Sequence, residues 1–405
     1  MTFFNSLIHT VYAQPSVVGN DLNIEAVVEG LSSPTGMTFL DDNNILVLEK
    51  RGNVRLVANG ILQEQPILHV PVNAEGESGL LGVAISNGSG SNQDITDTNV
   101  FLYYTEADPL RNRIYKYQWD GETLTNPTLI LDLPAGPHPN HNGGKITIGP
   151  DGYLYAVIGN LNRNGQLQNF VHGPPPDDTG SIFRINPEDG SAAPDNPFES
   201  SDNNFLSKYY AYGIRNSFGI NFDPVTGKLW DTENGEDKYD EINLVEPGFN
   251  SGWETVMGPI SRSEESEEDL VNFPGSHYAD PRFSWAGTVG LTDIEFLSSS
   301  NLGERYTNDI FVGDITRGNL YLFEVNENRD GISLDTAQQQ SDLTDLVVDD
   351  EDELSAITFA SGFGGITDIE TGPDGSLYVL SDADLITDTE EDGIIYEISS
   401  NTIPQ

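Results

Sequence analysis

The stretch PNHNGG, residues 139–144, places one histidine directly before a pair of glycines. Paired glycines let the backbone turn sharply or approach a ligand closely, so a side chain at such a turn is accessible. A neutral imidazole accepts a proton near neutral pH, and His141 is therefore a candidate general base. The alternative is a structural histidine that bonds only to the backbone of its own turn.

Further polar residues lie in two later stretches. Arg215 and Asn216, within YAYGIRNSFGINFDP, stand at a loop before an expected strand, where a planar cation can face a ligand. The stretch ENGEDKYDE, residues 233–241, gathers oxygen donors around Gly235. Ca²⁺ takes about six to eight oxygen ligands, including backbone carbonyls, so this stretch is a candidate calcium loop. A polar loop without a metal is the alternative.

Strands are the elements that we expect to hold these turns together. The chain has 41 Gly and 23 Pro and shows no long helical periodicity. Instead a hairpin pattern recurs, with two strand-like runs around a turn rich in Asp, Asn or Gly. The six cases are residues 37–50, 82–106, 146–160, 220–235, 294–315 and 369–382. A further strand is expected after each hairpin, within residues 52–60, 113–121, 181–190, 239–253, 319–327 and 393–400.

Six units at irregular spacing predict an all-β fold, a six-bladed β-propeller, because four-stranded blades tolerate insertions of variable length. We expect a single propeller domain over residues 21–400. The loops of a propeller converge around its central channel, so residues far apart in sequence can form one site there. A pair of β-sandwiches is the alternative fold.

Charge and composition exclude several classes of function. The chain carries 65 Asp+Glu against 18 Lys+Arg, a net charge of −47, which repels nucleic acid and anionic lipid. Cysteine is absent, which excludes disulfides and thiolate chemistry. The acidic runs at residues 263–270 and 345–354 are expected to be exposed loops without chemistry.

The N-terminal residues predict export. Residues 1–13, MTFFNSLIHTVYA, resemble the end of a secretory signal with cleavage before Gln14, although the positively charged start of such a signal is missing. No apolar run reaches the roughly 20 residues of a membrane helix, so we expect no transmembrane segment. The expected location is extracytoplasmic, and the expected oligomeric state is a monomer or a homodimer.

Several stretches, in order along the chain, resemble the soluble glucose/sorbosone dehydrogenase family, whose members are six-bladed propellers dependent on pyrroloquinoline quinone (PQQ). They include GLSSPTGMTFLDDNNILVLEKRGNVRLV, GESGLLGVAI, HNGGKITIGPDGYLYAVIGN, YAYGIRNSFGINFDPVTGKLW, YDEINLVEPGFNSGW and GPDGSLYVLSD. The resemblance implies an enzyme that oxidises the C1 hydroxyl of a sugar by hydride transfer to PQQ, assisted by Ca²⁺. The acceptor that would reoxidise the quinone is unknown.

The resemblance also implies roles for individual residues. His141 matches the family's catalytic base, and Arg215 with Asn216 matches an arginine–asparagine pair at the quinone. The backbone of Gly235 and Glu236 matches the family's calcium site.

The step formed by Asp240 and Glu241 matches a similar step in the family. There it implies either support of the calcium loop or a second calcium.

The departures from the family pattern concentrate on the quinone, which carries three carboxylates and needs cations or several donors around them. Thr316, next to Arg317, stands where the family has a lysine. Gly365 and Thr367 stand where it has two arginines. Tight binding of the usual quinone is therefore not expected.

Two more departures affect the histidine and the cavity. Asn160 stands in place of the acid that orients the family's histidine, which removes a charge that stabilises the imidazolium. Glu77 is acidic where a family member has glutamine, and it would repel a polyanion. Arg163 and Lys145 are the nearby cations that would compensate.

Three functions remain open from the sequence. The first is an exported, Ca²⁺-dependent aldose dehydrogenase with altered cofactor-binding residues. The second is a calcium-stabilised propeller that binds a carbohydrate or a protein without redox chemistry. The third is a propeller lactonase or hydrolase in which His141 activates water.

Overall fold

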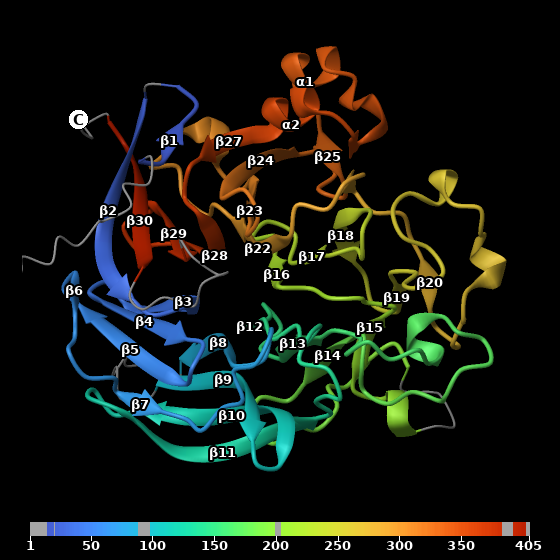
Figure 1. Cartoon of the computed structure of the whole chain (residues 1–405), viewed down its shortest axis with the longest axis horizontal. Helices are drawn as coiled ribbons and strands as arrows, with labels where there is room; N and C mark the ends of the chain where they lie inside the picture. The colour runs from blue at the N-terminus through green and yellow to red at the C-terminus, as the bar shows by residue number, and fades with distance from the viewer. Residues whose placement is uncertain (1–13, 20, 88–97, 199–203, 383–391, 402–405) are drawn as a thin grey trace, which may run out of the picture.

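The computed structural model of the chain describes residues 14–19, 21–87, 98–198, 204–382 and 392–401. In this part of the chain, strands form six sheets (Figure 1). Sheet 1 contains β3 (Pro34–Asp41), β4 (Asn44–Glu49), β5 (Asn53–Ala58), β6 (Ile61–Leu62) and β7 (Leu68–His69). Sheet 2 contains β8 (Leu80–Asn87), β9 (Thr98–Ala107), β10 (Leu110–Trp119) and β11 (Leu124–Leu133). Sheet 3 contains β12 (Ile146–Ile148), β13 (Leu154–Ile158), β14 (Ser181–Ile185), β15 (Tyr209–Tyr212), β19 (Phe249–Asn250) and β20 (His277–Tyr278).

The other sheets come from the second half of the chain and from its N-terminal strands. Sheet 4 contains β16 (Gly219–Phe222), β17 (Leu229–Glu233), β18 (Asp240–Val245), β21 (Phe283–Trp285) and β26 (Val347–Val348). Sheet 5 contains β22 (Leu291–Phe296), β23 (Ile310–Asp314), β24 (Asn319–Val325), β27 (Thr358–Ser361), β1 (Ser16–Val17) and β25 (Ile332–Ser333). Sheet 6 contains β28 (Gly365–Thr371), β29 (Leu377–Asp382), β30 (Gly393–Ser400) and β2 (Leu22–Leu31).

Helices are short and lie between strands. The α-helices are α1 (Thr336–Gln340) and α2 (Glu351–Ile357). The 3-10 turns are η2 (Gln166–Gln168), η3 (Asn204–Leu206), η4 (Ile260–Arg262), η5 (Glu267–Asp269), η6 (Glu304–Tyr306) and η7 (Leu343–Asp345). Within the described residues, no helix is both long and apolar enough to cross a bilayer.

The six predicted hairpins are confirmed: in each sheet the hairpin forms the inner strand and the strand next to it. In each sheet the predicted third strand pairs with the second strand of the hairpin. The inner strands β3, β8, β12, β16, β22 and β28 each contact the next one in this order, and β28 contacts β3. The sheets therefore form a closed ring around an axis, which confirms an all-β propeller and excludes a pair of sandwiches (Figure 1).

The ring is closed by the two ends of the chain. The N-terminal strand β2 pairs with the C-terminal strand β30, from Leu22 opposite Ser400 to Leu31 opposite Gly393. This pairing makes sheet 6 from both ends of the sequence, so the ring cannot open without breaking a ladder of backbone hydrogen bonds. Residues 1–13, which carry the predicted leader, lie outside the described residues.

Two of the hairpins use the same local turn. In the first GPDG turn, Asp151 accepts the N–H of Tyr153 and the hydroxyl of Tyr155. In the second, Asp374 accepts the N–H of Ser376 and the hydroxyl of Tyr378. An Asp that bonds to the backbone two residues later fixes a tight turn without help from the rest of the fold, which explains why the sequence predicted these hairpins.

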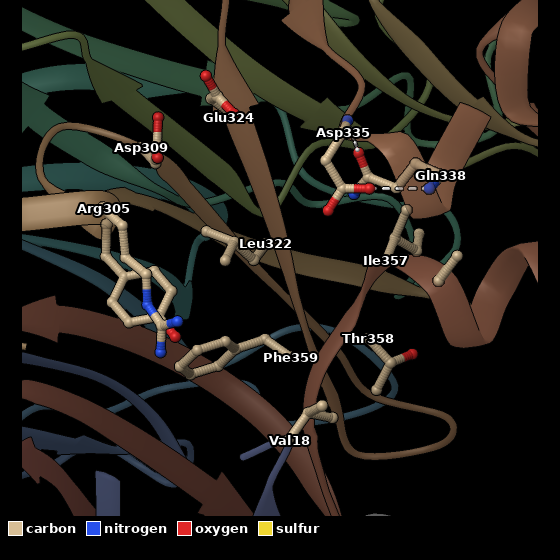
Figure 2. Close-up of a pocket in the computed structure, with 12 residues that line it drawn as sticks. Val18, Arg305, Asp309, Leu322, Glu324, Asp335, Gln338, Ile357, Thr358 and Phe359 are labelled. Atoms are coloured by element: carbon tan, nitrogen blue, oxygen red, sulfur yellow. Dashed lines mark hydrogen bonds between the residues drawn. The ribbon is translucent and has the colours of Figure 1, made fainter. Parts of the chain in front are cut away.

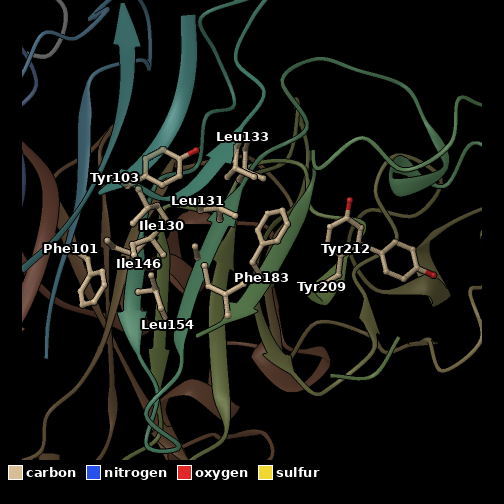
Figure 3. Close-up of a cluster of buried hydrophobic side chains, with 14 of the residues drawn as sticks. Phe101, Tyr103, Ile130, Leu131, Leu133, Ile146, Leu154, Phe183, Tyr209 and Tyr212 are labelled. Carbon is tan, nitrogen blue, oxygen red and sulfur yellow. The ribbon is translucent and has the colours of Figure 1, made fainter. Parts of the chain in front are cut away.

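Hydrophobic clusters fill the spaces between neighbouring sheets. The cluster between sheets 2 and 3 joins β9 and β11 to the strands of sheet 3 (Figure 3). Within it, the rings of Phe183 and Tyr209 meet edge to face at 5.2 Å between centroids. Both side chains are about 1% exposed and belong to paired strands of sheet 3, so their ring geometry stabilises that sheet while their burial contributes to the cluster.

The second acidic run differs from the prediction. Residues 345–354 were expected to be an exposed loop, but they contain β26 and the start of α2. Asp350 is the N-cap of this helix, because its side chain accepts the N–H groups of Asp352 and Glu353. Acidic residues at a helix N-terminus satisfy free N–H groups and complement the helix dipole, so this run has a structural use that its charge alone did not reveal.

Carboxylates connect neighbouring inner strands. Inner strands have one unpaired edge, and their N–H groups there need acceptors. Asp293 in β22 accepts the N–H of Ile369 in β28, and Asp368 in β28 accepts the N–H of Met37 in β3. Acidic side chains facing the axis thus join sheets 5, 6 and 1 at the centre of the ring.

Candidate active site

The predicted catalytic loops converge at one end of the ring. His141 precedes the inner strand β12, and Arg215 precedes the inner strand β16. Asn160 follows β13, which runs antiparallel to β12, so it returns to the same end as His141. Its N–H donates to the carbonyl of Arg215 at 2.8 Å, which ties the loops of sheets 3 and 4 together.

Gly159 makes this approach possible. A Cβ at this position would lie 2.5 Å from the carbonyl oxygen of His141 and 2.7 Å from that of Arg215. These separations are too short for carbon and oxygen, so any side chain would push the two loops apart. The backbone carrying the histidine and the backbone carrying the arginine meet because residue 159 is glycine.

Asn160 fixes the tautomer of His141. Its Oδ1 lies 2.6 Å from Nδ1 of the ring and also accepts the N–H of Asn162 at 3.0 Å. An oxygen that accepts a backbone N–H must be the carbonyl oxygen of the amide, so Nδ1 of His141 carries the proton. Nε2 is left with a free lone pair and accepts or donates no hydrogen bond within the described residues.

His141 is neutral at pH 7. Its side chain is 8% exposed, and burial lowers its pKa below the ordinary value. The positive charge of Arg215 lowers the pKa further, whereas the bond to Asn160 and the charges of Glu77 and Glu236 oppose this effect. A neutral ring with a free Nε2 is the form that a general base requires.

Glu77 organises the loops rather than standing free. Its Oε2 accepts the N–H of His141 at 2.7 Å and the Nδ2 of Asn216 at 2.9 Å. Asn216 in turn accepts the N–H of Gly143 through Oδ1 at 3.2 Å. Glu77 and Asn216 therefore connect sheets 2, 3 and 4 around the histidine.

Arg215 is held in place by the neighbouring strand. Its N–H donates to Oε1 of Glu233 at 2.7 Å, and its Nη1 donates to the carbonyl of Asn234 at 3.0 Å. The guanidinium lies over the ring of Trp253, 5.2 Å from its centroid, a contact across loops that sequence patterns did not signal. Burial lowers the pKa of Arg215, and the charges of Glu236, Glu77 and Glu233 oppose this shift.

The predicted calcium loop contains a buried amide oxygen without a hydrogen-bond partner. Oδ1 of Asn234 is buried and has no hydrogen-bond partner. The side chain of Asp240 is committed, because Oδ1 accepts the N–H of Gly235 and Oδ2 accepts those of Val289 and Gly290.

Glu241 is committed in the same way, since its Oε1 accepts the N–H of Gly258. Asp240 therefore holds the loop at Gly235, whereas Glu241 bonds to Gly258 outside the loop, and a second calcium at these residues stays a prediction. Among the described residues, acidic side chains spaced for a metal occur at Asp349, Asp350 and Glu353, at the start of α2 and outside this loop.

A cavity of about 270 Å³ lies on the axis beside these loops. Its walls are mostly apolar or glycine, with Phe218 among them. Four charged residues line it within the described part of the chain: Lys50, Glu77, Lys145 and Asp368. Lys50 was not singled out from the sequence, because it lies in a turn whose position beside the axis depends on the ring.

Lys145 is already neutralised. Its Nζ lies 2.9 Å from Asp293 and 2.5 Å from Asp368, both of which are buried. Burial lowers the pKa of Lys145, but the charges of Asp293, Asp368 and Glu370 outweigh this and raise it well above the ordinary value. Lys145 is therefore a cation that serves the carboxylates of the inner strands.

Of the other predicted cofactor residues, some line the cavity and others do not. Thr367 lines the cavity, whereas Thr316 and Arg317 do not. Arg317 forms a two-point ion pair with Glu351, both bonds 3.0 Å long, and is largely exposed. Arg163 pairs with Asp177 at 2.9 Å and donates to the carbonyl of Gly136. The two arginines expected to help hold a cofactor are thus engaged elsewhere.

Comparison with known proteins places this arrangement in a family. The model of the family described as Glucose / Sorbosone dehydrogenase matches residues 31–387. The chain belongs to this family. The resemblance read from the sequence is therefore confirmed.

Relatives of this glucose/sorbosone dehydrogenase family member span most of its length. Uncharacterized protein slr1608 of Synechocystis sp. is 29% identical over 395 residues, covering 90% of this chain and 86% of the relative. Aldose sugar dehydrogenase YliI of Escherichia coli is 25% identical over 387 residues, covering 92% of each. The crystal structure of a putative oxidoreductase (glucose dehydrogenase) from Thermus thermophilus is 29% identical, with a TM-score of 0.73 and coverage of 93% of this chain and 99% of that one.

His141 and Arg215 do not line the axial cavity, and the charges that do line it do not favour PQQ. Three carboxylates need several unpaired cations, and here Glu77 and Asp368 add negative charge while Lys145 is neutralised. Lys50 is the one lining cation without an ion pair in the described residues. The same end of the ring fits Ca²⁺ better, because Asn234 offers a buried unpaired oxygen next to the backbone of Gly235 and Glu236.

Proposed function

We propose that this protein acts on an aldose and that His141 removes the proton from the C1 hydroxyl as the first half of a sugar oxidation. One observation carries the proposal: His141 is neutral, its Nδ1–H is held by Asn160, and its Nε2 lone pair is free. Membership of a family whose relatives include an aldose sugar dehydrogenase supports the choice of substrate.

The proton transfer follows from the residues around the ring. The O–H bond of the sugar breaks, an N–H bond forms at Nε2, and the ring becomes an imidazolium ion. Asn160 orients this ion but does not neutralise it, while Glu77 and Glu236 stabilise it through their charges. Arg215, next to the histidine, offers positive charge to the oxygen that loses its proton.

Calcium would act beside the arginine. Oδ1 of Asn234 and the backbone carbonyls of Gly235 and Glu236 would hold it, and as a Lewis acid it would polarise an oxygen of the bound group. Completing the oxidation also requires a hydride acceptor. The charges that line the cavity favour an acceptor with fewer carboxylates than PQQ.

A second function is favoured by the same charges. A propeller that binds a carbohydrate without redox chemistry needs no unpaired cations in its cavity. This is consistent with Lys145, whose charge is neutralised, and with Glu77, whose carboxylate accepts the N–H of His141. The two functions share the sugar but differ in the acceptor.

One experiment separates them. Purified protein with Ca²⁺ is titrated with PQQ while the absorbance of the bound quinone is followed, and dye reduction is then measured with a panel of aldoses, with and without added quinones. Dye reduction that depends on His141 supports the oxidation, whereas sugar binding without dye reduction under every condition supports the second function.

A matched control is available in the same loop. His141→Ala should abolish turnover, whereas His138→Ala, at an exposed histidine three residues earlier, should leave it unchanged. Full activity of the His141 variant would reject the assignment of the base.

We take the six sheets as six blades and residues 21–400 as one propeller domain. We also propose an exported protein, a monomer or homodimer, that begins at Gln14 after removal of its leader. N-terminal sequencing of the protein recovered outside the cytoplasm tests the cleavage site, and any intact residue before Gln14 would contradict it.

A further inference from the structure

A second cavity, of about 340 Å³, lies at the edge of sheet 5 beside the segments that carry α1 and α2 (Figure 2). Apolar side chains from three segments line it, among them Leu322 of β24, Ile357 of α2 and Phe359 of β27. The proposed sugar site does not use this cavity. The remaining side chains that line it are polar, and Asp309, Glu324 and Asp335 among them are acidic.

Two carboxylates lie on neighbouring strands at one end of the cavity. β23 and β24 are antiparallel with Ile310 opposite Phe323, which places Asp309 opposite Glu324. Figure 2 shows both side chains at the same end, with Leu322 next to them. Like charges in directly opposite positions destabilise a sheet, and a cation between them removes that repulsion. Asp309 is buried whereas Glu324 is exposed, so water already screens part of the repulsion on the Glu324 side.

No cation of the described chain neutralises this pair. Asp309 is 8% exposed, and its Oδ1 accepts the N–H of Val325 at 3.1 Å. Its Oδ2, like the whole carboxylate of Glu324, makes no hydrogen bond or ion pair within the described residues. Figure 2 shows Asp335 farther along the cavity, where its carboxylate caps α1 by accepting the N–H of Gln338.

The nearby arginines are engaged elsewhere. Arg305 lies over the ring of Tyr306, 4.5 Å from its centroid, and its closest acid is Asp21 at 3.6 Å. Arg329 pairs with Asp223 at 2.7 Å and donates to the carbonyl of Asn308. Arg305 is itself among the residues that line the cavity, but neither arginine forms an ion pair with Asp309 or Glu324.

We propose that this cavity binds a small organic ammonium ion, with its charge between Asp309 and Glu324 and its alkyl body against Leu322, Ile357 and Phe359. The ammonium replaces the missing counter-ion of the pair through charge-assisted hydrogen bonds. The apolar lining covers the alkyl chain, and the neutral alcohol of equal length lacks the charge. Recognition therefore requires both the charge and the chain.

The site has a defined pH dependence. Burial and the charge of Glu324 raise the pKa of Asp309 to about 6, against the opposing effects of the Val325 N–H and Arg329. A bound cation stabilises the ionised form, so affinity is full above this value and falls as Asp309 becomes protonated below it. An alkylammonium, whose pKa resembles that of lysine at about 10, stays charged throughout this range.

The test uses n-pentylammonium chloride as the probe and n-pentanol as its neutral counterpart, with binding followed by saturation-transfer NMR on the full chain. We expect binding of the ammonium and none, or far less, of the alcohol. Glu324→Gln should weaken binding by about fivefold or more. The matched control Glu327→Gln removes one negative charge from an exposed residue in the following turn and should leave affinity unchanged.

A second variant separates binding from folding. In Asp309→Asn the side-chain oxygen can still accept the Val325 N–H, so the fold is retained, while the like-charge pair is lost. We expect weaker binding together with a higher Tm of the free protein. Equal binding of pentanol, equal loss in the Glu324 and Glu327 variants, or affinity that does not change between pH 7 and 5 would each overturn the proposal. None of these outcomes depends on sugar oxidation.

Discussion

Replacing Asn160 by aspartate tests how this protein holds its histidine. The wild-type amide accepts the Nδ1–H of His141 at 2.6 Å and is itself fixed by the N–H of Asn162, so a carboxylate at the same position would make the same contacts with a negative charge. In Asn160→Asp the imidazolium gains an adjacent counter-ion. The variant should therefore bind the ring proton more tightly.

The magnitude follows from the geometry. An opposite charge in direct contact shifts a pKa by about 1–3 units, and each unit corresponds to about 1.4 kcal/mol. Burial and Arg215 hold the pKa of His141 below 6.5 in the wild type. We expect Asn160→Asp to raise that pKa by about 1–3 units, equivalent to about 1.4–4 kcal/mol of added stabilisation of the imidazolium.

The assay is NMR titration of the imidazole resonances, with the signal of His141 assigned by comparison with His141→Ala. Asn162→Asp is the matched control, because it adds the same charge two residues away on an exposed side chain. This control should shift the pKa by much less. A wild-type pKa at or above 6.5, or equal shifts in the two variants, would refute the reasoning about burial and the amide contact.

Two other predictions concern buried charge. Lys145→Met leaves Asp293 and Asp368 buried without their cation, so the free energy of unfolding in urea should fall by about 3–5 kcal/mol, while Lys145→Arg should retain most of it. An unchanged midpoint in Lys145→Met would mean that these carboxylates are neutral without it. Burial raises the pKa of Glu233 and of Glu295 from 4.5 to about 7, so the folded state binds more protons than the unfolded state in that interval, and stability falls as the pH rises through it. Tm should be higher at pH 5 than at pH 7, and Glu233→Gln should reduce the difference; a Tm independent of pH would contradict this.

The candidate site could be predicted in part. His141, Arg215, Asn216 and Glu77 were expected at one mouth, and hydrogen bonds through Gly143 and Asn160 bring their loops together. Their positions follow from hairpins whose turns are visible in the sequence. Once the strands alternate in direction, the turn that begins each inner strand must lie at the same end of the ring.

The roles of the cations could not be predicted in this way. Lys145 and Arg317 looked available for a cofactor, but Lys145 is paired with Asp293 and Asp368, and Arg317 with Glu351. The partners of Lys145 lie on β22 and β28, which are far from Lys145 in the sequence. Whether a charge is free depends on which distant side chain reaches it.

The sequence by itself determined the six hairpins of this protein. A turn such as GPDG is fixed by hydrogen bonds from Asp151 to residues two and four positions later, so its structure depends only on nearby residues in the sequence. Only the tertiary structure decided which charges remain for a ligand. Closing the ring brings acidic side chains on the inner strands next to Lys145 and next to the unpaired backbone edges of neighbouring sheets. These partners are far apart in the sequence, so no local sequence pattern indicates the pairing.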